Sequence, residues 1–307
     1  MQRTHGFAIA IAGLSLATVA GASAIPGSAT AQKRGHRRVT RTAPVARESG
    51  ENYREDRNGG QRQINFSRVV NLSHVIEAGT SDMTQAEPNG SGMPIWPGDP
   101  DMSFTTEANI DPDGYFLRSF SMGEHSATNM NSYNSFQEST DSIDDYTADK
   151  LVVPVVVINV TAQAAANADY QLTVDDVRAW ERRNGRIQKG AVVLLYTGWQ
   201  DLWSTNPKKF IGADADGNLH FPGFAPDTTT WLLSNRRIGG AGIDTHGVDP
   251  GADLNYSTNN AVLAKHGIVL ENLTNLDKLP VRGATIVIGA LHLKDGSGAP
   301  AEVLAFV

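Results

Sequence analysis

Short runs of aliphatic and β-branched residues recur from residue 63 to the end of the chain, and segments rich in Gly, Pro and Asn separate them. Runs of this length and composition are typical of buried β-strands. Clusters of glycine and proline predict loops over residues 206–226 and 294–300. The predicted strands cover residues 69–76, 151–160, 191–197, 238–244, 267–273, 284–293 and 301–307.

A helix is predicted to begin after Thr173, because a threonine followed three residues later by an acid, here Asp176, can form a capping box. The apolar positions of the following turns fall on one face, and Gly185 ends the helix. Two further helical segments are predicted over residues 227–237 and 259–263. Helices that alternate with buried strands place the chain in the α/β class.

The first 31 residues have the pattern of an export signal, with Arg3 before an apolar run over residues 7–19 and small residues at 22–24 and 29–31. The run is too short to span a membrane. The alternative is a buried core helix. The export pattern predicts a secreted or periplasmic protein with no membrane span.

Residues 32–62 are rich in Arg, Gly and Gln and nearly free of large apolar side chains, so we predict a disordered basic linker. Residues 1–62 hold ten Lys or Arg and four Asp or Glu, which leaves 16 basic against 29 acidic residues, a net charge near −13. A domain this acidic is poorly suited to nucleic acid. The absence of cysteine excludes disulfides, thiolate nucleophiles and Cys-ligated zinc.

A dense polar cluster lies in residues 123–136, between stretches that resemble ordinary core. Its members His125, Asn129, Asn131 and Ser135 are spaced by four, two and four residues, which we interpret as a bent loop or short helix that turns them into one pocket. Imidazole and carboxylate groups at these positions would indicate a metal site. The chain has amides and a hydroxyl there instead.

Other candidate residues lie on predicted strands and turns. Glu271 is an acid in an apolar strand, where a carboxylate is costly unless it is paired or binds a metal. Trp96 sits in a rigid Pro- and Gly-rich turn over residues 93–100 and could form the wall of a pocket for a planar ligand, or merely cover the core. His246 follows the strand over residues 238–244, at the end where loops build sites.

Residues 125–136 match the pattern His-x-Gly-Thr-His-x-Asp-x-Pro-x-His-Phe, so the chain resembles the cyclase superfamily, which includes bacterial kynurenine formamidase and isatin hydrolase. The resemblance covers nearly all of residues 66–307, and we predict one domain over residues 63–307. Further matching segments are the early strand with His74, residues 93–100, 197–199 and 242–245, Asp249-Pro250, and residues 270–273 and 296–300.

The resemblance implies a swivelling β/β/α fold, with a mixed sheet or barrel-like core and flanking helices, in a homodimer or homotetramer. It also implies a divalent metal, Zn²⁺ or Mn²⁺, that activates water against a small amide, formamide or lactam. An arylformamidase of this kind takes part in tryptophan catabolism.

The family's metal-ligand positions fall mostly on neutral side chains in this chain. The family has His where Asn129, Ser135 and Asn259 stand, and Asp where Asn131 stands. Neutral amide oxygens are weak ligands for Zn²⁺ or Mn²⁺, so we expect metal binding to be weak or absent. The six positions are His125, Asn129, Asn131, Ser135, Asn259 and Glu271.

Two main functions follow from this substituted site. The first is a hydrolase with a rebuilt metal site, or a metal-free one in which His125 is the general base, Glu271 orients it, and the amides of Asn129 and Asn131 stabilise the oxyanion. The second is a pseudoenzyme whose pocket binds a small aromatic or amide ligand. A third option is a structural homo-oligomer. Candidate substrate-binding residues are Trp96, Trp199, His74, His246 and His220, although lone histidines are more often structural.

Overall fold

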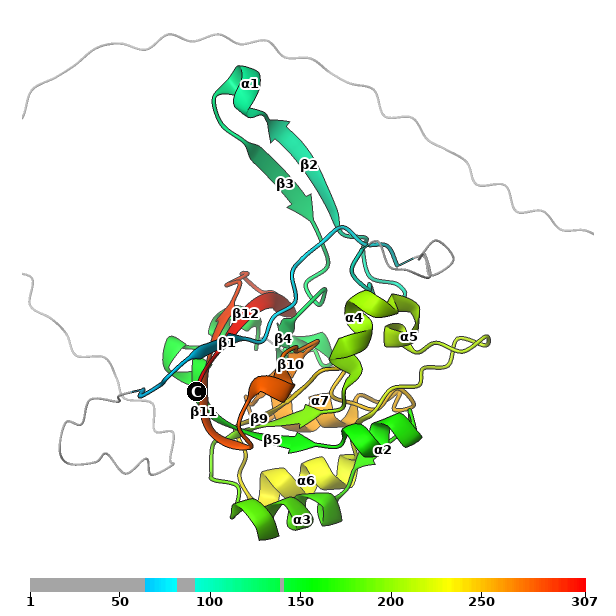
Figure 1. Cartoon of the computed structure of the whole chain (residues 1–307), viewed down its shortest axis with the longest axis vertical. Coiled ribbons are helices and arrows are strands. Elements are labelled where there is room, and N and C mark those ends of the chain that lie inside the picture. The colour runs from blue at the N-terminus through cyan, green and yellow to red at the C-terminus, as the bar shows by residue number, and fades with distance from the viewer. Residues whose placement is uncertain (1–63, 82–91, 139–140) are drawn as a thin grey trace, which may run out of the picture. The chain divides into compact units, whose positions relative to one another are not determined.

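The computed structural model describes residues 64–81, 92–138 and 141–307, and Gln61–Val307 form one compact unit (Figure 1). The predicted export signal over residues 1–31 and the predicted linker over residues 32–62 lie outside the described residues. Among the described residues, no helix is long and apolar enough to cross a bilayer.

The core is one mixed sheet of eight strands in the order β1-β12-β11-β5-β7-β9-β10-β4. Strand β4 also pairs with β12, so seven of these strands close into a barrel and β1 extends it at β12. The strands are β1 Val69–Asn71, β4 Asn129–Asn131, β5 Val152–Asn159, β7 Val192–Tyr196, β9 Gly240–Ile243, β10 Ile268–Glu271, β11 Arg282–Ala290 and β12 Gly298–Phe306.

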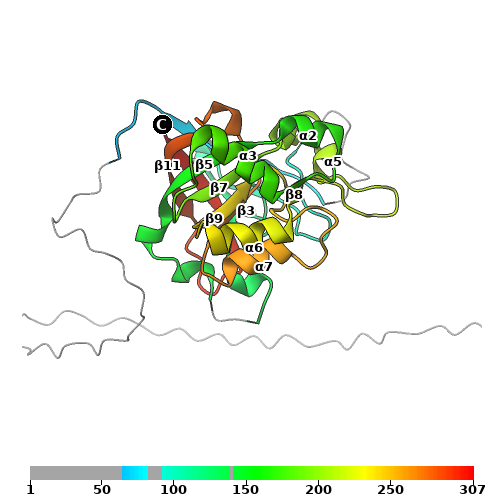
Figure 2. The same cartoon turned by 90° about the horizontal axis from the view of Figure 1, so that it is seen from below.

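Strands β5, β7, β9 and β10 are parallel, and parallel neighbours need crossover connections. Helices α3, α6 and α7 lie in these crossovers and cover the outer face of the parallel strands (Figures 1 and 2). The helices are α1 Ile110–Asp113, α2 Thr161–Ala166, α3 Val174–Asn184, α4 Leu202–Thr205, α5 Pro207–Ile211, α6 Pro226–Asn235 and α7 Ser257–Leu263.

Alternate residues of each central strand enter two different apolar clusters. On β7, Leu194 belongs to the cluster inside the barrel and Leu195 to the cluster beneath the helices, and Val157 and Val156 on β5 divide in the same way. Side chains of a strand alternate between its faces, so a strand buried on both faces is apolar at every position. This explains the continuous apolar runs of the sequence.

The polar stretch over residues 123–136 differs from its prediction as a bent loop or short helix. It contains strand β4, followed by a 3₁₀ turn at Tyr133–Ser135. The two-residue spacing of Asn129 and Asn131 is the period of a strand, and it places both on the face opposite the buried Met130.

Both predicted loops also contain regular structure. Helix α5 lies within residues 206–226, where the Asn206 side chain accepts a hydrogen bond from Lys209 N (3.0 Å) and Pro207 occupies the first turn. Strand β12 begins at Gly298, inside the predicted connection over residues 294–300.

Two short sheets lie outside the barrel. Strands β2, Ser103–Ala108, and β3, Leu117–Ser121, form a hairpin that projects away from the barrel (Figure 1). Strands β6, Gln171–Leu172, and β8, Gly223–Phe224, pair in parallel. The sequence pattern did not predict either pair.

Candidate functional site

A pocket of about 200 Å³ opens where β4, β10 and α7 meet the loops around Trp96 and His246. We call it the central pocket. It brings together residues far apart in the sequence, including Trp96, Asp99, His125, Asn131, Ser135, Phe136, Phe221, His246, Asp249, Tyr256, Asn259 and Glu271.

Strand pairing positions the polar residues of this pocket. In the antiparallel register of β4 and β10, Asn129 lies opposite Glu271, and on its other side β4 pairs with β12. Helix α7 contributes Asn259, whose side chain contacts Asn131 on β4 and Glu271 on β10. Four of the six family ligand positions, Asn129, Asn131, Asn259 and Glu271, are therefore fixed by regular structure and are buried.

The side chains at these positions bind one another. Asn259 Nδ2 donates to Glu271 Oε1 (3.1 Å) and to Asp249 Oδ2 (2.8 Å). Because the two carboxylates need donors, the Asn259 oxygen faces the other way and accepts from Asn131 Nδ2 (3.0 Å). Asn131 Oδ1 in turn accepts from Asn129 Nδ2 (2.8 Å). We call this set of residues the amide chain.

His125 lies at the end of the amide chain. Its Nδ1 is 2.8 Å from Asn131 Oδ1, which can only accept, so Nδ1 is the donor. Its Nε2 is 2.9 Å from Ser297 Oγ, and Ser297 Oγ donates its single hydrogen to Glu124 Oε2 (2.6 Å). Both ring nitrogens of His125 therefore have hydrogen-bond partners within the protein, Asn131 on one side and Ser297 on the other.

This geometry corrects the prediction that Glu271 orients a basic His125. The ring of His125 is held by Asn131 and Ser297, whereas Glu271 accepts from Asn259 and from Val248 N (3.2 Å). The Asn131 oxygen, rather than its amide nitrogen, faces the imidazole.

Gly298 makes room for the imidazole of His125. A Cβ atom at residue 298 would lie 2.6 Å from His125 Cε1 and 2.8 Å from the carbonyl oxygen of Met130. Real Cβ atoms do not approach other atoms this closely, so a side chain here would displace the ring or β4.

Aromatic residues form the opposite wall. The rings of Trp96 and His246 stack 3.9 Å apart with an interplanar angle of 5°, and Phe221 meets Trp96 edge-on at 5.9 Å. Burial, with a smaller contribution from the nearby charge of His125, lowers the pKa of His246 to about 3. His246 is therefore a neutral, planar part of the wall near pH 7.

Two carboxyl groups of the pocket have raised pKa values. Burial raises the pKa of Asp249 to about 6, although hydrogen bonds from Asn259 and from Thr258 N oppose the shift. Burial also raises the pKa of Asp99, and the charge of His125 opposes that shift. Perturbed carboxyl groups in a cavity are typical of functional sites.

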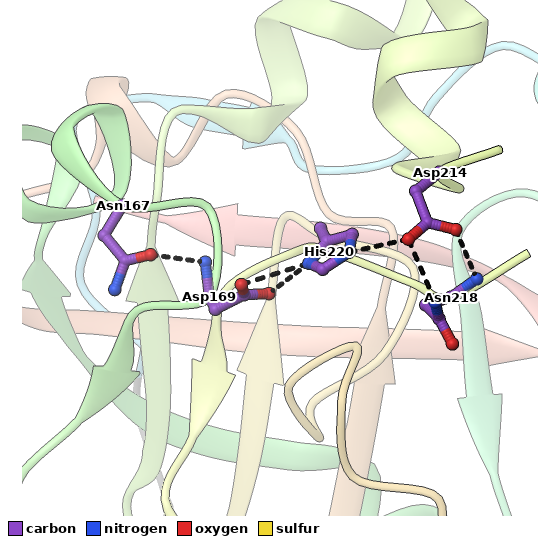
Figure 3. A network of polar contacts seen from close by, with 5 residues as sticks. All are labelled: Asn167, Asp169, Asp214, Asn218 and His220. Atoms are coloured by element: carbon purple, nitrogen blue, oxygen red, sulfur yellow. Dashed lines mark hydrogen bonds and ion pairs between the residues drawn. The ribbon is translucent and has the colours of Figure 1, made fainter. Parts of the chain in front are cut away.

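Three of the predicted substrate-binding residues lie elsewhere. His74 stacks on Trp203 at 4.1 Å in a separate groove, and burial lowers its pKa to about 4. Trp199 is buried and donates Nε1 to the Phe210 oxygen (3.0 Å). His220 lies between two acids outside the pocket (Figure 3). Only Trp96 and His246 of this group line the central pocket.

Ser135, the remaining ligand position, lines the pocket and donates to the Ser297 carbonyl oxygen. Asp99, Glu124, Asp249 and Ser297 were not predicted as site residues. Each lies in or beside a segment that the family resemblance matched, which was the available signal. Which of their side chains meet in space depends on tertiary packing.

The residues present do not fit the metal of the family. Four of the six expected ligand positions are neutral, and three of these, Asn129, Asn131 and Asn259, already use their donors and acceptors in the amide chain. Within the described ranges, no group of three His, Cys, Asp or Glu side chains could hold an ion. Zn²⁺ and Mn²⁺ need imidazole or carboxylate ligands, which this set supplies only at His125 and Glu271.

Comparisons with known proteins agree on one family. The family described as "Putative cyclase" matches residues 70–250. Isatin hydrolase from Roseibium aggregatum is 33% identical over 210 residues, which are 65% of this chain and 79% of that protein.

Solved structures of isatin hydrolases share the fold. Isatin hydrolase A from Ralstonia solanacearum superposes with a TM-score of 0.68 at 30% identity, over 78% of this chain and 92% of that one. Isatin hydrolase A from Labrenzia aggregata, bound to benzyl benzoate, gives a TM-score of 0.67 at 29% identity, over 78% and 93%. The predicted cyclase-like α/β fold is confirmed. The named relatives are isatin hydrolases, not kynurenine formamidases.

Proposed function

Because this chain belongs to the cyclase family, whose members compared above are hydrolases, we propose that its central pocket binds a small planar amide or lactam without the metal centre of the family. The amide chain carries this proposal. It joins Asn129, Asn131 and Asn259 to Glu271 and His125 by hydrogen bonds, so these polar side chains already have partners within the chain, which supports a site without an ion.

The pocket suits a planar ligand of modest size. Its volume of about 200 Å³ is below the roughly 300–1,000 Å³ typical of sites for drug-sized ligands. The stacked pair of Trp96 and His246 offers an aromatic surface, and aromatic pairs gain about 0.5–1.5 kcal/mol beyond area burial. Asp99, with its raised pKa, can donate to a ligand carbonyl when protonated.

The ligands of relatives support this chemical class. One isatin hydrolase structure contains the product analogue thioisatinate, and another contains benzyl benzoate. Both relatives share the fold of this chain, and the aromatic wall here provides the surface that such ligands require.

A second candidate function is metal-free hydrolysis of the same ligands. It is favoured by Asp99 and His125, which line the same pocket. The Asp99 carboxylate, beside the His125 ring, would take a proton from water as the water oxygen adds to the carbonyl carbon, and the proton would pass to the leaving nitrogen as the C–N bond breaks. General acid–base catalysis of this kind raises the reaction rate of enzymes by about 10²–10⁴-fold.

The test is a calorimetric titration of the protein with isatin in the presence of EDTA, with product formation followed by absorbance. We expect saturable binding that Trp96→Ala weakens and that Trp199→Ala, whose side chain lies in the core, affects only through stability. Metal content is measured by mass spectrometry after incubation with Mn²⁺ or Zn²⁺ and desalting. One stoichiometric ion, or isatin binding that EDTA abolishes, would overturn the proposal. Product formation in EDTA would establish the second candidate.

A further inference from the structure

Another cavity lies where helix α3 meets the end of helix α6, two helices that contact each other over the sheet (Figure 1). Its volume is about 390 Å³, and its lining consists of four arginines and one glutamate, namely Arg178, Glu181, Arg182, Arg186 and Arg236. None of these residues lines the central pocket. We call this cavity the arginine cleft.

Helix α3 supplies three of the lining residues from a rigid base. Arg178, Glu181 and Arg182 share one face of the helix, because residues three and four apart are neighbours on a helix surface. Val177 and Trp180 of the same helix are buried in the cluster beneath the helices, so α3 is fixed to the core. The other two arginines follow the ends of α3 and α6 within two residues.

The single carboxylate of the cleft neutralises only one of the four arginines. Arg236 Nε and Nη2 donate to Glu181 Oε1 (2.6 Å) and Oε2 (2.7 Å), and both side chains of this bidentate pair are 12% exposed. Glu181 Oε1 also accepts from Ile187 N (3.0 Å). Arg186 Nη2 donates to the carbonyl oxygen of Asn235 (2.8 Å), which carries no charge. Four positive side chains against one negative side chain leave the cleft with a net charge of +3.

The remaining arginines have weak partners or none. Arg178 Nη1 lies 3.5 Å from Asp175 Oδ1, and this pair is too exposed to contribute much. Arg182 makes no hydrogen bond or ion pair with any residue in the described ranges. The guanidinium groups of Arg178 and Arg236 lie 5.7 Å and 4.1 Å from the centre of the same Trp231 ring. Like charges held this close repel each other, and an anion between them relieves the repulsion.

The helix dipole accounts for only part of this cluster. Basic side chains in the last turn of a helix interact favourably with its carboxyl end, which explains Arg182 and its neighbour Arg183. The effect is confined to the last turn, so it does not extend to Arg178, and the other two arginines of the cleft lie outside α3. Residues 63–307 carry 16 basic against 29 acidic residues, so a cavity with this positive charge is contrary to the charge of the domain.

We propose that the arginine cleft binds a phosphate monoester, carried by a small molecule or by a lipid headgroup. A phosphate monoester has three acceptor oxygens and a charge of about −1.5 to −2 near pH 7, so several guanidinium groups can bind it from different sides. A carboxylate has two oxygens and a single charge, which matches less of the cleft. The volume of the cleft leaves room for the group that carries the phosphate.

The charge of the domain disfavours nucleic acid as the partner. Each phosphate of a nucleic acid is a diester with one negative charge, and a strand longer than the cleft would extend over the acidic remainder of the surface. A compact ligand avoids this repulsion. This site is separate from the central pocket, so its ligand is independent of the function proposed for that pocket.

Calorimetric titration of the full chain with glycerol 3-phosphate at low salt tests the proposal. We expect saturable binding that Arg182→Gln weakens by about tenfold or more, because a charge-assisted hydrogen bond is lost. Arg178→Gln should weaken it in the same way. Arg183→Gln is the matched control, since it removes the same charge from the same turn of α3 but does not line the cleft, and it should change the affinity less than about twofold.

Vesicle flotation distinguishes the two sources of the phosphate. Binding to phosphatidylcholine vesicles that contain phosphatidic acid, if it depends on Arg182 and occurs without binding of glycerol 3-phosphate, would assign the cleft to a lipid headgroup. Residues 1–62, which carry ten basic side chains, are the same in every variant, so their contribution cancels from the comparison.

Three outcomes would overturn the proposal. The first is that neither glycerol 3-phosphate nor phosphatidic acid binds. The second is that Arg182→Gln and Arg183→Gln weaken binding equally, which would indicate diffuse attraction to positive charge instead of a site. The third is that acetate displaces glycerol 3-phosphate at equal concentration, which would indicate a carboxylate ligand. The binding of isatin to the central pocket should be the same in all of these variants, so a failure here would leave the proposed function unchanged.

Discussion

Asn131 shows how one side chain changes the chemistry of a shared fold. It stands where the family pattern used in the sequence analysis has an aspartate, and it both donates to Asn259 and accepts from His125 and Asn129. An aspartate could accept from His125 and Asn129 but could not donate to Asn259. The amide of Asn131 therefore links Asn259 to His125 and Asn129, whereas a carboxylate at this position would leave acceptor oxygens available to a cation.

Restoring the family's residues should restore a metal site. We expect the variant Asn129→His/Asn131→Asp/Ser135→His/Asn259→His to bind one Mn²⁺ or Zn²⁺ and to gain thermal stability when the ion is added. The wild type should show neither effect, because it lacks imidazole and carboxylate ligands at these positions. Metal analysis and thermal unfolding with and without the ion measure the difference. If the variant folds but takes up no ion, features of the chain other than these four residues also prevent metal binding.

His220 gives a prediction about pH. Its Nδ1 lies 2.9 Å from Asp169 Oδ1 and its Nε2 lies 3.4 Å from Asp214 Oδ2 (Figure 3). The hydrogen bond to Asp169, followed by that to Asp214, raises the pKa of His220 above its usual 6.5. The folded state therefore binds the proton more tightly than the unfolded chain does, and the stabilisation is complete below pH 6.5.

As the pH rises through the raised pKa of His220, this stabilisation is lost. The difference in unfolding temperature between the wild type and His220→Gln should accordingly be larger at pH 6 than at pH 9. Thermal denaturation at the two pH values measures it. An equal or larger difference at pH 9 would contradict the ion pairs drawn in Figure 3.

At the scale of elements, local signals specified the ends of helix α3. The side chain of Thr173 accepts from Asp176 N (3.2 Å), and Asp176 Oδ2 accepts from Thr173 N (2.8 Å), so the predicted capping box is confirmed. We expect Thr173→Ala to lower the free energy of unfolding by about 1 kcal/mol, whereas Thr173→Ser should be close to neutral. Chemical denaturation measures both variants. A neutral Thr173→Ala would show that the cap contributes little here.

Two other elements escaped prediction for physical reasons. Strand β4 has only three residues, two of them polar, and its partners β10 and β12 come more than 130 residues later. The β2–β3 hairpin has no buried face, so its strands lack the alternation that burial imposes. By contrast, β5 and β7 are buried on both faces, and their apolar composition was sufficient to predict them.

The site was predictable only in part for a similar reason. The family pattern found His125, Asn131 and Glu271, which do line one pocket. It did not distinguish Trp96, which lines that pocket, from Trp199, which lies in the core. Both tryptophans lie within two residues of a glycine in segments that match the family, and only the packing of distant segments separates them.

For the whole molecule, the two apolar clusters on either side of the sheet should contribute to one cooperative core. Leu194 and Leu195 are both fully buried, one inside the barrel and one beneath the helices. We expect Leu194→Ala and Leu195→Ala each to lower the free energy of unfolding by about 2–5 kcal/mol. Denaturation followed by circular dichroism and by tryptophan fluorescence should give coincident transitions. Transitions that separate in either variant would show that the two sides unfold independently.

The double pairing of β4 links the pocket to the architecture of the whole domain. This strand is the seam at which the sheet closes on itself, with β10 on one side and β12 on the other. Its two asparagines hydrogen-bond to neighbouring segments, Asn131 to Asn259 and Asn129 to Asn272, and Asn131 also lines the central pocket. These polar residues therefore connect β4 to its neighbours, and a mutation that removes their hydrogen bonds should loosen the closure of the barrel as well as the pocket.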